Sequence, residues 1–127
     1  MLSRGYMSGT RSILIVEDEP LIAMMLEDFI LSLGHDVSGN CDTVKGALAE
    51  IEKGRFDLAI LDVNLKGESV WPVAKALRSK GTPFVLASGG HVDPPPPEFA
   101  GVPMIEKPYT IDRVTPIIDA ALASSAS

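Results

Sequence analysis

The stretch LAILDVNLKGE (residues 58–68) lies at the centre of the chain and decides the fold. Its first four residues are all apolar, Asp62 follows them directly, and a polar segment containing Gly67 comes next. A short run that is apolar at every position is typical of a strand buried on both faces of a parallel sheet. The stretch therefore predicts a central strand with a carboxylate at its carboxyl end.

Similar elements recur on both sides of this stretch. Further apolar runs occupy residues 13–16, 84–87 and 102–105, and a weaker, polar strand suited to a sheet edge occupies residues 36–40. Apolar residues at helical spacing fill residues 20–33, 43–53, 68–79 and 111–122. Strands that alternate with helices predict an α/β domain, in which helices cover both faces of a five-stranded parallel sheet.

The alternation is interrupted at one place. A helix is expected between the strands at residues 84–87 and 102–105, but residues 94–97 are four consecutive prolines. Proline lacks a backbone N–H group and favours an extended polyproline segment. We therefore expect the helix of this region, residues 91–100, to be irregular or missing. The apolar surface that it would otherwise cover favours self-association into a homodimer.

Length and charge restrict the class of protein. The 127 residues suit one domain, which we place at residues 11–123, between a disordered leader at 1–10 and a disordered tail at 124–127. Eleven basic and 17 acidic residues give a net charge of −6, which argues against nucleic-acid binding. A single cysteine, Cys41, excludes a disulfide framework, and no apolar run is long enough to span a membrane. These features predict a cytoplasmic protein.

Polar residues follow the predicted strands at their carboxyl ends, which meet at one edge of a parallel sheet. Glu17 and Asp18 follow the first strand, Asp62 and Asn64 the third, Ser88 the fourth and Lys107 the fifth. Three neighbouring carboxylates repel one another, and a hard cation such as Mg²⁺ together with an ammonium group relieves that repulsion. The open positions of the cation accept phosphate oxygens. The pattern predicts a magnesium-dependent phosphoryl site.

These motifs resemble those of the response-regulator receiver domains of bacterial two-component signalling. The resemblance covers about residues 11–123, and it rests on VEDEP (residues 16–20), LDVNL (residues 61–65), Ser88 and the dipeptide Lys107-Pro108. It implies the flavodoxin-like fold with strand order 2-1-3-4-5. Residues 83–90 and 61–68 are also similar to a single-domain alphaproteobacterial subgroup with a Phe-Ala-Thr-Gly-Tyr signature, although Leu86, Ser88 and Gly90 depart from it.

The resemblance also implies a role for each site residue. Asp62 would accept a phosphoryl group from a histidine kinase or phosphotransferase. Glu17, Asp18, Asp62 and the backbone carbonyl of Asn64 would hold Mg²⁺. Lys107 and Ser88 would contact the phosphoryl oxygens. The protein would then signal through a phosphorylation-dependent change in protein binding, or serve as a phosphate sink.

The sequence departs from the family pattern at Met104, where the family usually has Tyr or Phe as a rotameric switch. We therefore expect a smaller conformational change on phosphorylation than is usual, centred on residues 88–101. The same departure leaves open a second interpretation, a phosphorylation-independent interaction module on a receiver fold. An enzyme is not expected beyond slow self-dephosphorylation, because Asn64 stands where an aspartyl-phosphate hydrolase needs a second acid. We assign His35 and His91 no role and expect Trp71 to pack in the interior.

Overall fold

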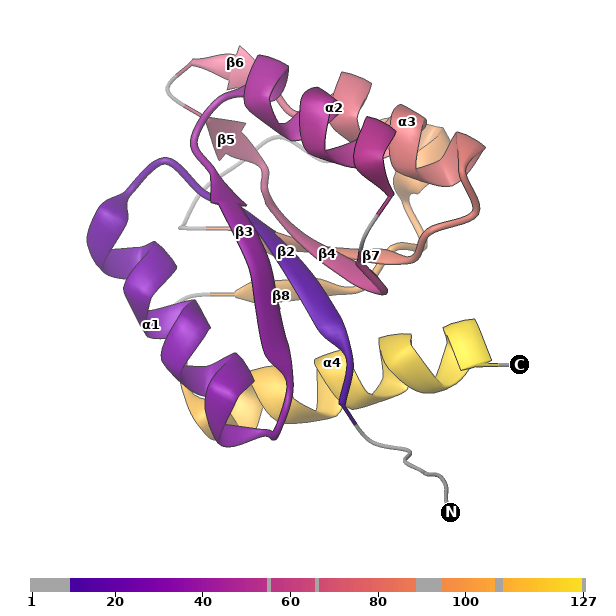
Figure 1. Cartoon of the computed structure of the whole chain (residues 1–127). Coiled ribbons are helices and arrows are strands. Elements are labelled where there is room, and N and C mark those ends of the chain that lie inside the picture. The colour runs from indigo at the N-terminus through magenta and orange to yellow at the C-terminus, as the bar shows by residue number, and fades with distance from the viewer. Residues whose placement is uncertain (1–9, 55, 66, 89–94, 107–108, 127) are drawn as a thin grey trace.

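The structure is a computed structural model, which describes residues 10–54, 56–65, 67–88, 95–106 and 109–126 (Figure 1). For residues 124–126 only the backbone is considered. Lys107, Pro108, His91 and Pro94, which the sequence analysis singled out, lie outside the described residues.

A parallel sheet forms the centre of the molecule. Its strands are β2 (Ser12–Val16), β3 (Asp36–Cys41), β4 (Leu58–Asp62), β7 (Phe84–Ser88) and β8 (Met104–Glu106). They lie in the order β3-β2-β4-β7-β8, and every pairing within this sheet is parallel. Counted among themselves these strands have the order 2-1-3-4-5, which confirms the predicted flavodoxin-like fold.

Helices cover both faces of the sheet. Helices α1 (Pro20–Ser32) and α4 (Ile111–Ala126) lie on one face, and α2 (Val44–Lys53) and α3 (Trp71–Ser79) lie on the other (Figure 1). Successive strand residues face opposite sides, so Ile13 and Ile15 pack with α1 and α4 while Leu14 and Val16 pack with α2 and α3. The sheet is therefore buried on both faces, as its continuous apolar runs predicted.

The third helix begins later than predicted. Residues 68–79 were expected to be helical, but α3 starts at Trp71, and Glu68–Ser69 instead forms strand β6, antiparallel to β5 (Asn64–Leu65). The turn between β5 and β6 contains Gly67 at φ +81°, a conformation that side chains other than glycine rarely adopt. Glu68 accepts a hydrogen bond from the backbone N–H of Val44 at 3.2 Å, which links the hairpin to the start of α2. This contact holds Glu68 outside the helix.

The described part of the region where a helix was expected to be irregular or missing contains a short turn. Within the described residues 95–103, the only helical element is a 3-10 turn, η1 (Pro97–Phe99). Phe99 is 0% exposed, and its ring stacks on Trp71 at 5.5 Å between centroids and meets the edge of Phe84 at 5.9 Å. One aromatic side chain thus fills space above the sheet in a region where a helix would otherwise pack. Trp71 packs inward, as predicted.

Both edge strands are irregular or short. At one edge, the register between β2 and β3 shifts between Ile13 and Leu14. At the other edge, β8 has only three residues.

At the carboxyl end of the chain, α4 extends through Ala126, beyond the predicted end at residue 122, because alanine favours helix continuation. Residues 124–126, which the sequence analysis assigned to a disordered tail, are therefore part of this helix, and residue 127 lies outside the described residues.

Candidate phosphorylation and metal site

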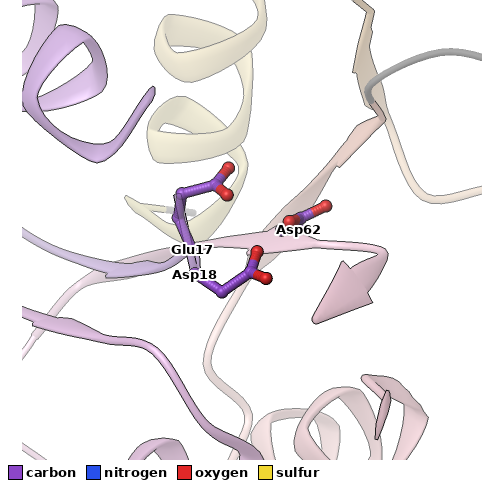
Figure 2. Close-up of side chains that lie close together, drawn as sticks. All are labelled: Glu17, Asp18 and Asp62. Carbon is purple, nitrogen blue, oxygen red and sulfur yellow. The ribbon is translucent and has the colours of Figure 1, made fainter. Parts of the chain in front are cut away.

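Three predicted carboxylates come together at the carboxyl edge of the sheet. Glu17 and Asp18 directly follow β2, and Asp62 ends β4, the neighbouring strand, where Val16 is in register with Leu61. One carboxylate oxygen from each of the three residues lies within 4.8 Å of the others. Figure 2 shows the three side chains next to one another. Two adjacent strands thus place three acids in one small volume.

Backbone N–H groups orient two of these carboxylates. The N–H of Glu19 donates to Oε2 of Glu17 at 3.0 Å, and the N–H of Asn64 donates to Oδ1 of Asp62 at 3.1 Å. The backbone N–H of Glu17 also donates to the carbonyl of Cys41 at 2.9 Å, which extends the β2–β3 pairing into the site. The carboxylates of Glu17 and Asp62 are therefore held by the backbone that follows each strand.

The electrostatics of the cluster disfavour full ionisation. Burial raises the pKa of Glu17 to about 8, and the negative charges of Asp62 and Asp18 contribute to the rise. Burial also raises the pKa of Asp62, with a further contribution from Asp18. Glu17 is only 3% exposed, so water screens its charge poorly. The site consequently favours any group that brings positive charge.

The donor set fits Mg²⁺. A magnesium ion binds oxygen ligands at about 2.1 Å, which keeps those ligands within about 4 Å of one another. The three carboxylates, with oxygens inside 4.8 Å, approach this arrangement and need only small side-chain adjustments. Carboxylates are also the ligands that hard cations select. Asn64 is an exposed residue whose N–H contacts Asp62, and its carbonyl as a ligand stays a prediction.

Ser88 lies on the next strand along the same edge. It ends β7, is 3% exposed, and directly follows Ala87, which is in register with Asp62. The N–H of Val63 donates to the carbonyl of Ala87 at 3.0 Å and ties the two strand ends together. Ser88 is in turn in register with Glu106, the residue before Lys107. The position of the Lys107 ammonium group remains outside the described residues.

Tyr109 is a neighbour of the site that the sequence analysis did not identify. Its side chain is 5% exposed, and its pKa is raised by burial and then by the charges of Glu17 and Asp62. An aromatic residue two positions after the lysine of the Lys-Pro dipeptide was the available signal. Met104, by contrast, is half-buried against the core on the α2 and α3 side of the sheet.

The comparison with known families agrees with this fold and site. The sequence model described as response regulator receiver domain matches residues 13–118. The chain therefore belongs to the response-regulator receiver domain family of two-component signal transduction. Members of this family are phosphorylated by histidine kinases, bind Mg²⁺ at an acidic pocket, and generally have no enzymatic activity apart from self-dephosphorylation.

Particular relatives resemble the chain over most of its length. SdrG from Sphingomonas melonis Fr1 is 50% identical, with a TM-score of 0.79 over 95% of this chain and 100% of that one. The receiver domain of PhyR from Erythrobacter litoralis is 31% identical, with a TM-score of 0.78 over 94% and 95%. The transcriptional regulatory protein TcrA of Mycobacterium tuberculosis is 32% identical over 119 residues, which are 87% of this chain. The chain spans 45% of the length of TcrA.

Among the described residues, no helix is both long and apolar enough to cross a membrane. Even α4 (Ile111–Ala126) contains Asp112, Arg113 and Asp119.

Cys41 at the end of β3 yields a first testable prediction. The residue is 9% exposed, and burial, followed by the charge of Glu50, raises the pKa of its thiol. Because the thiolate is the reactive form, we expect the folded protein to react with Ellman's reagent at least roughly tenfold more slowly than the urea-unfolded protein. The release of the coloured thiolate measures both rates, and equal rates would contradict the buried position of Cys41.

Proposed function

We propose that the protein is a response regulator that accepts a phosphoryl group on Asp62 from a histidine kinase or a phosphotransferase. The observation that carries the proposal is the arrangement of Glu17, Asp18 and Asp62 at the ends of adjacent strands, with oxygens within 4.8 Å. In a receiver fold this arrangement supports a nucleophilic role for Asp62 beside a magnesium site. No other carboxylate of the described residues combines these features.

The chemistry is a transfer of one phosphoryl group. An oxygen of the Asp62 carboxylate attacks phosphorus in line with the phosphorus–nitrogen bond of a phosphohistidine, and that bond breaks to release the imidazole. Glu17, Asp18, Asp62 and the Asn64 carbonyl would hold Mg²⁺, which would supply positive charge next to the phosphoryl oxygens. The N–H of Asn64 holds Asp62 in place. The hydroxyl of Ser88 and the ammonium group of Lys107 contact two phosphoryl oxygens.

The output of the protein is a change in protein binding, or the removal of phosphoryl groups from a kinase as a phosphate sink. Both outputs act in the cytoplasm, and the lifetime of the phosphoryl group is set by slow self-hydrolysis. A homodimer is a further candidate assembly.

A second function is favoured by Met104, which is half-buried and has no hydroxyl group to couple to Ser88. That function is an interaction module that acts without phosphorylation.

The test is intact-mass spectrometry after incubation with acetyl phosphate and Mg²⁺. The wild-type protein is expected to gain one phosphoryl group, and Asp62→Asn is expected to gain none. Asp57→Asn is the matched control, because Asp57 precedes the same strand and its Oδ2 accepts from Ser12 at the other end of the sheet. An unlabelled wild type, under conditions that label another receiver domain, would favour the interaction module. Labelling of Asp62→Asn would place the acceptor elsewhere.

A further inference from the structure

A pocket lies at the end of the molecule opposite to the acidic site. It is an open hollow of about 600 Å³, and its lining includes Arg78, Glu98 and Gly101 together with four apolar residues. Phe84 is the first residue of β7, whereas Ser88 at the acidic site is the last. We call this cavity the distal pocket. Pro83, Phe84, Val102 and Pro103 make part of its wall apolar, and its volume is in the range that holds a side chain or a small ligand.

Positive charge gathers next to the distal pocket in an otherwise acidic protein. The chain has a net charge of −6, but residues 69–92 contain no Asp or Glu and do contain Lys75, Arg78 and Lys80. Trp71, Lys75 and Arg78 are spaced four and three residues apart in α3, so they lie on one side of the helix. We call these three residues the α3 stripe.

Aromatic contacts show where the α3 stripe faces. The ring of Trp71 stacks on Phe99, and the guanidinium carbon of Arg78 lies 4.7 Å from the centre of the same ring. The stripe therefore runs beside η1, from Trp71 to the distal pocket, which Arg78 helps to line. Lys80 is directed away from it, because its ammonium group lies 3.8 Å from Glu52 on α2.

Arg78 still has N–H donors for a ligand in this arrangement. One of its nitrogens donates to the backbone carbonyl of Glu98, and a guanidinium group has five N–H donors. Glu98 is the acid of the lining, and it contacts Arg78 through this carbonyl. Within the described part of the chain, the ion pairs involve only Lys53 and Lys80, so neither Arg78 nor Lys75 is neutralised by a carboxylate there.

We infer that the α3 stripe and the distal pocket together form a docking surface for an acidic segment of a partner protein. The segment places one apolar side chain in the distal pocket and sets carboxylates against Lys75 and Arg78. Charge complementarity favours this occupant, because the surface presents Lys75 and Arg78 on a protein whose net charge is −6. The inference goes beyond the proposed function and does not depend on phosphorylation of Asp62.

The test uses the fluorescence of Trp71, the one tryptophan in the chain. The unphosphorylated wild-type protein is titrated with the acetylated and amidated peptide Glu-Asp-Phe-Glu-Asp at low salt. We expect a saturable change in Trp71 emission that weakens as the salt concentration rises. Two control peptides, Gln-Asn-Phe-Gln-Asn and Glu-Asp-Ser-Glu-Asp, are expected to bind more weakly, because one lacks the charge and the other lacks the apolar side chain.

Two pairs of variants locate the binding surface. Lys75→Glu reverses an exposed charge of the α3 stripe and should weaken the apparent Kd by roughly fivefold. Lys45→Glu makes the same change in net charge at an exposed position on α2 and should leave the Kd unchanged. Gly101 lines the distal pocket, and a Cβ added there meets no atom within 4 Å. A phenylalanine ring at this wall of the distal pocket would compete with the apolar side chain of the segment, so Gly101→Phe should weaken binding strongly, whereas Gly101→Ala should retain it.

Several results would overturn the inference. Equal weakening by Lys75→Glu and Lys45→Glu would show an effect of net charge alone. Equal binding of the acidic and the amide peptide would remove the role assigned to charge. A thymidine oligonucleotide provides a further test. If the oligonucleotide binds saturably, if Lys75→Glu abolishes that binding, and if the acidic peptide does not bind, the surface is a nucleic-acid site instead. Thermal melts of all variants confirm that each is folded.

Discussion

Replacing Phe99 with alanine is expected to lower the free energy of unfolding by about 3–5 kcal/mol. Among the described residues, Phe99 is the largest side chain that is fully buried. It contacts Trp71 and Phe84, and Arg78 lies over its ring. Removal of the ring leaves a cavity between Trp71 and Phe84, and the lost contacts and the cavity both cost stability. Urea unfolding followed by circular dichroism measures the loss.

Two matched variants separate this effect from a general sensitivity to truncation. Phe99→Leu keeps most of the apolar volume and is expected to cost clearly less than Phe99→Ala. Leu31→Ala removes an apolar side chain that is 56% exposed on α1, and its effect should remain within about 0.5 kcal/mol. If Phe99→Ala lowered the free energy of unfolding as little as Leu31→Ala, the packing of Phe99 against Trp71 and Phe84 would not stabilise the fold as described.

Removing one carboxylate from the acidic site is expected to stabilise the metal-free protein and to destroy its response to Mg²⁺. Glu17 is buried close to Asp18 and Asp62, so Glu17→Gln relieves repulsion and should raise the melting temperature in EDTA. In wild type, Mg²⁺ at a hundredfold its Kd should add about 2.7 kcal/mol of stability. Asp18→Asn should lose most of this gain, and differential scanning fluorimetry measures both effects.

The pH dependence of the metal-free protein follows from the raised pKa of Glu17. A group whose pKa rises from 4.5 to about 8 on folding stabilises the fold fully below pH 4.5 and loses this contribution as the pH increases through about 8. The gain from Glu17→Gln should therefore be larger at pH 8.5 than at pH 5. A gain that is independent of pH, or a Mg²⁺ response that survives in Asp18→Asn, would contradict the assignment of these carboxylates. Asp36→Asn, at an exposed position on β3, is the control.

Much of the fold was predictable because the strands are buried on both faces. Apolar runs such as residues 58–61 contain no polar residue, and the runs at 13–16, 58–61 and 84–87 are each followed directly by an acid or hydroxyl residue of the site. The boundary of α3 was wrong, because Glu68 and Ser69 are acceptable residues for the first turn of a helix. Their pairing with Asn64 and Leu65, and the contact of Glu68 with Val44, are features of the folded chain that the residue types alone do not indicate.

The site was predictable to the extent that it follows from strand ends. Glu17, Asp18 and Asp62 meet as expected, since neighbouring parallel strands end at the same edge. Tyr109 was missed because it follows the strand end by three residues, where the sequence does not show which way a side chain turns. Phe99 was missed as a core residue because the neighbouring prolines indicate an exposed loop.

The two edges of the sheet also determine whether the backbone of a second molecule could pair with it. Edge strands present unpaired N–H and C=O groups that can template the addition of a strand from another molecule, the first step towards aggregation. Here β3 carries polar residues and a shift in register, and β8 offers only three residues. In the described part of the chain, neither edge gives a long, flat apolar template. The surface beside α3 that carries Lys75 and Arg78 is therefore not accompanied there by a sheet edge suited to the addition of strands.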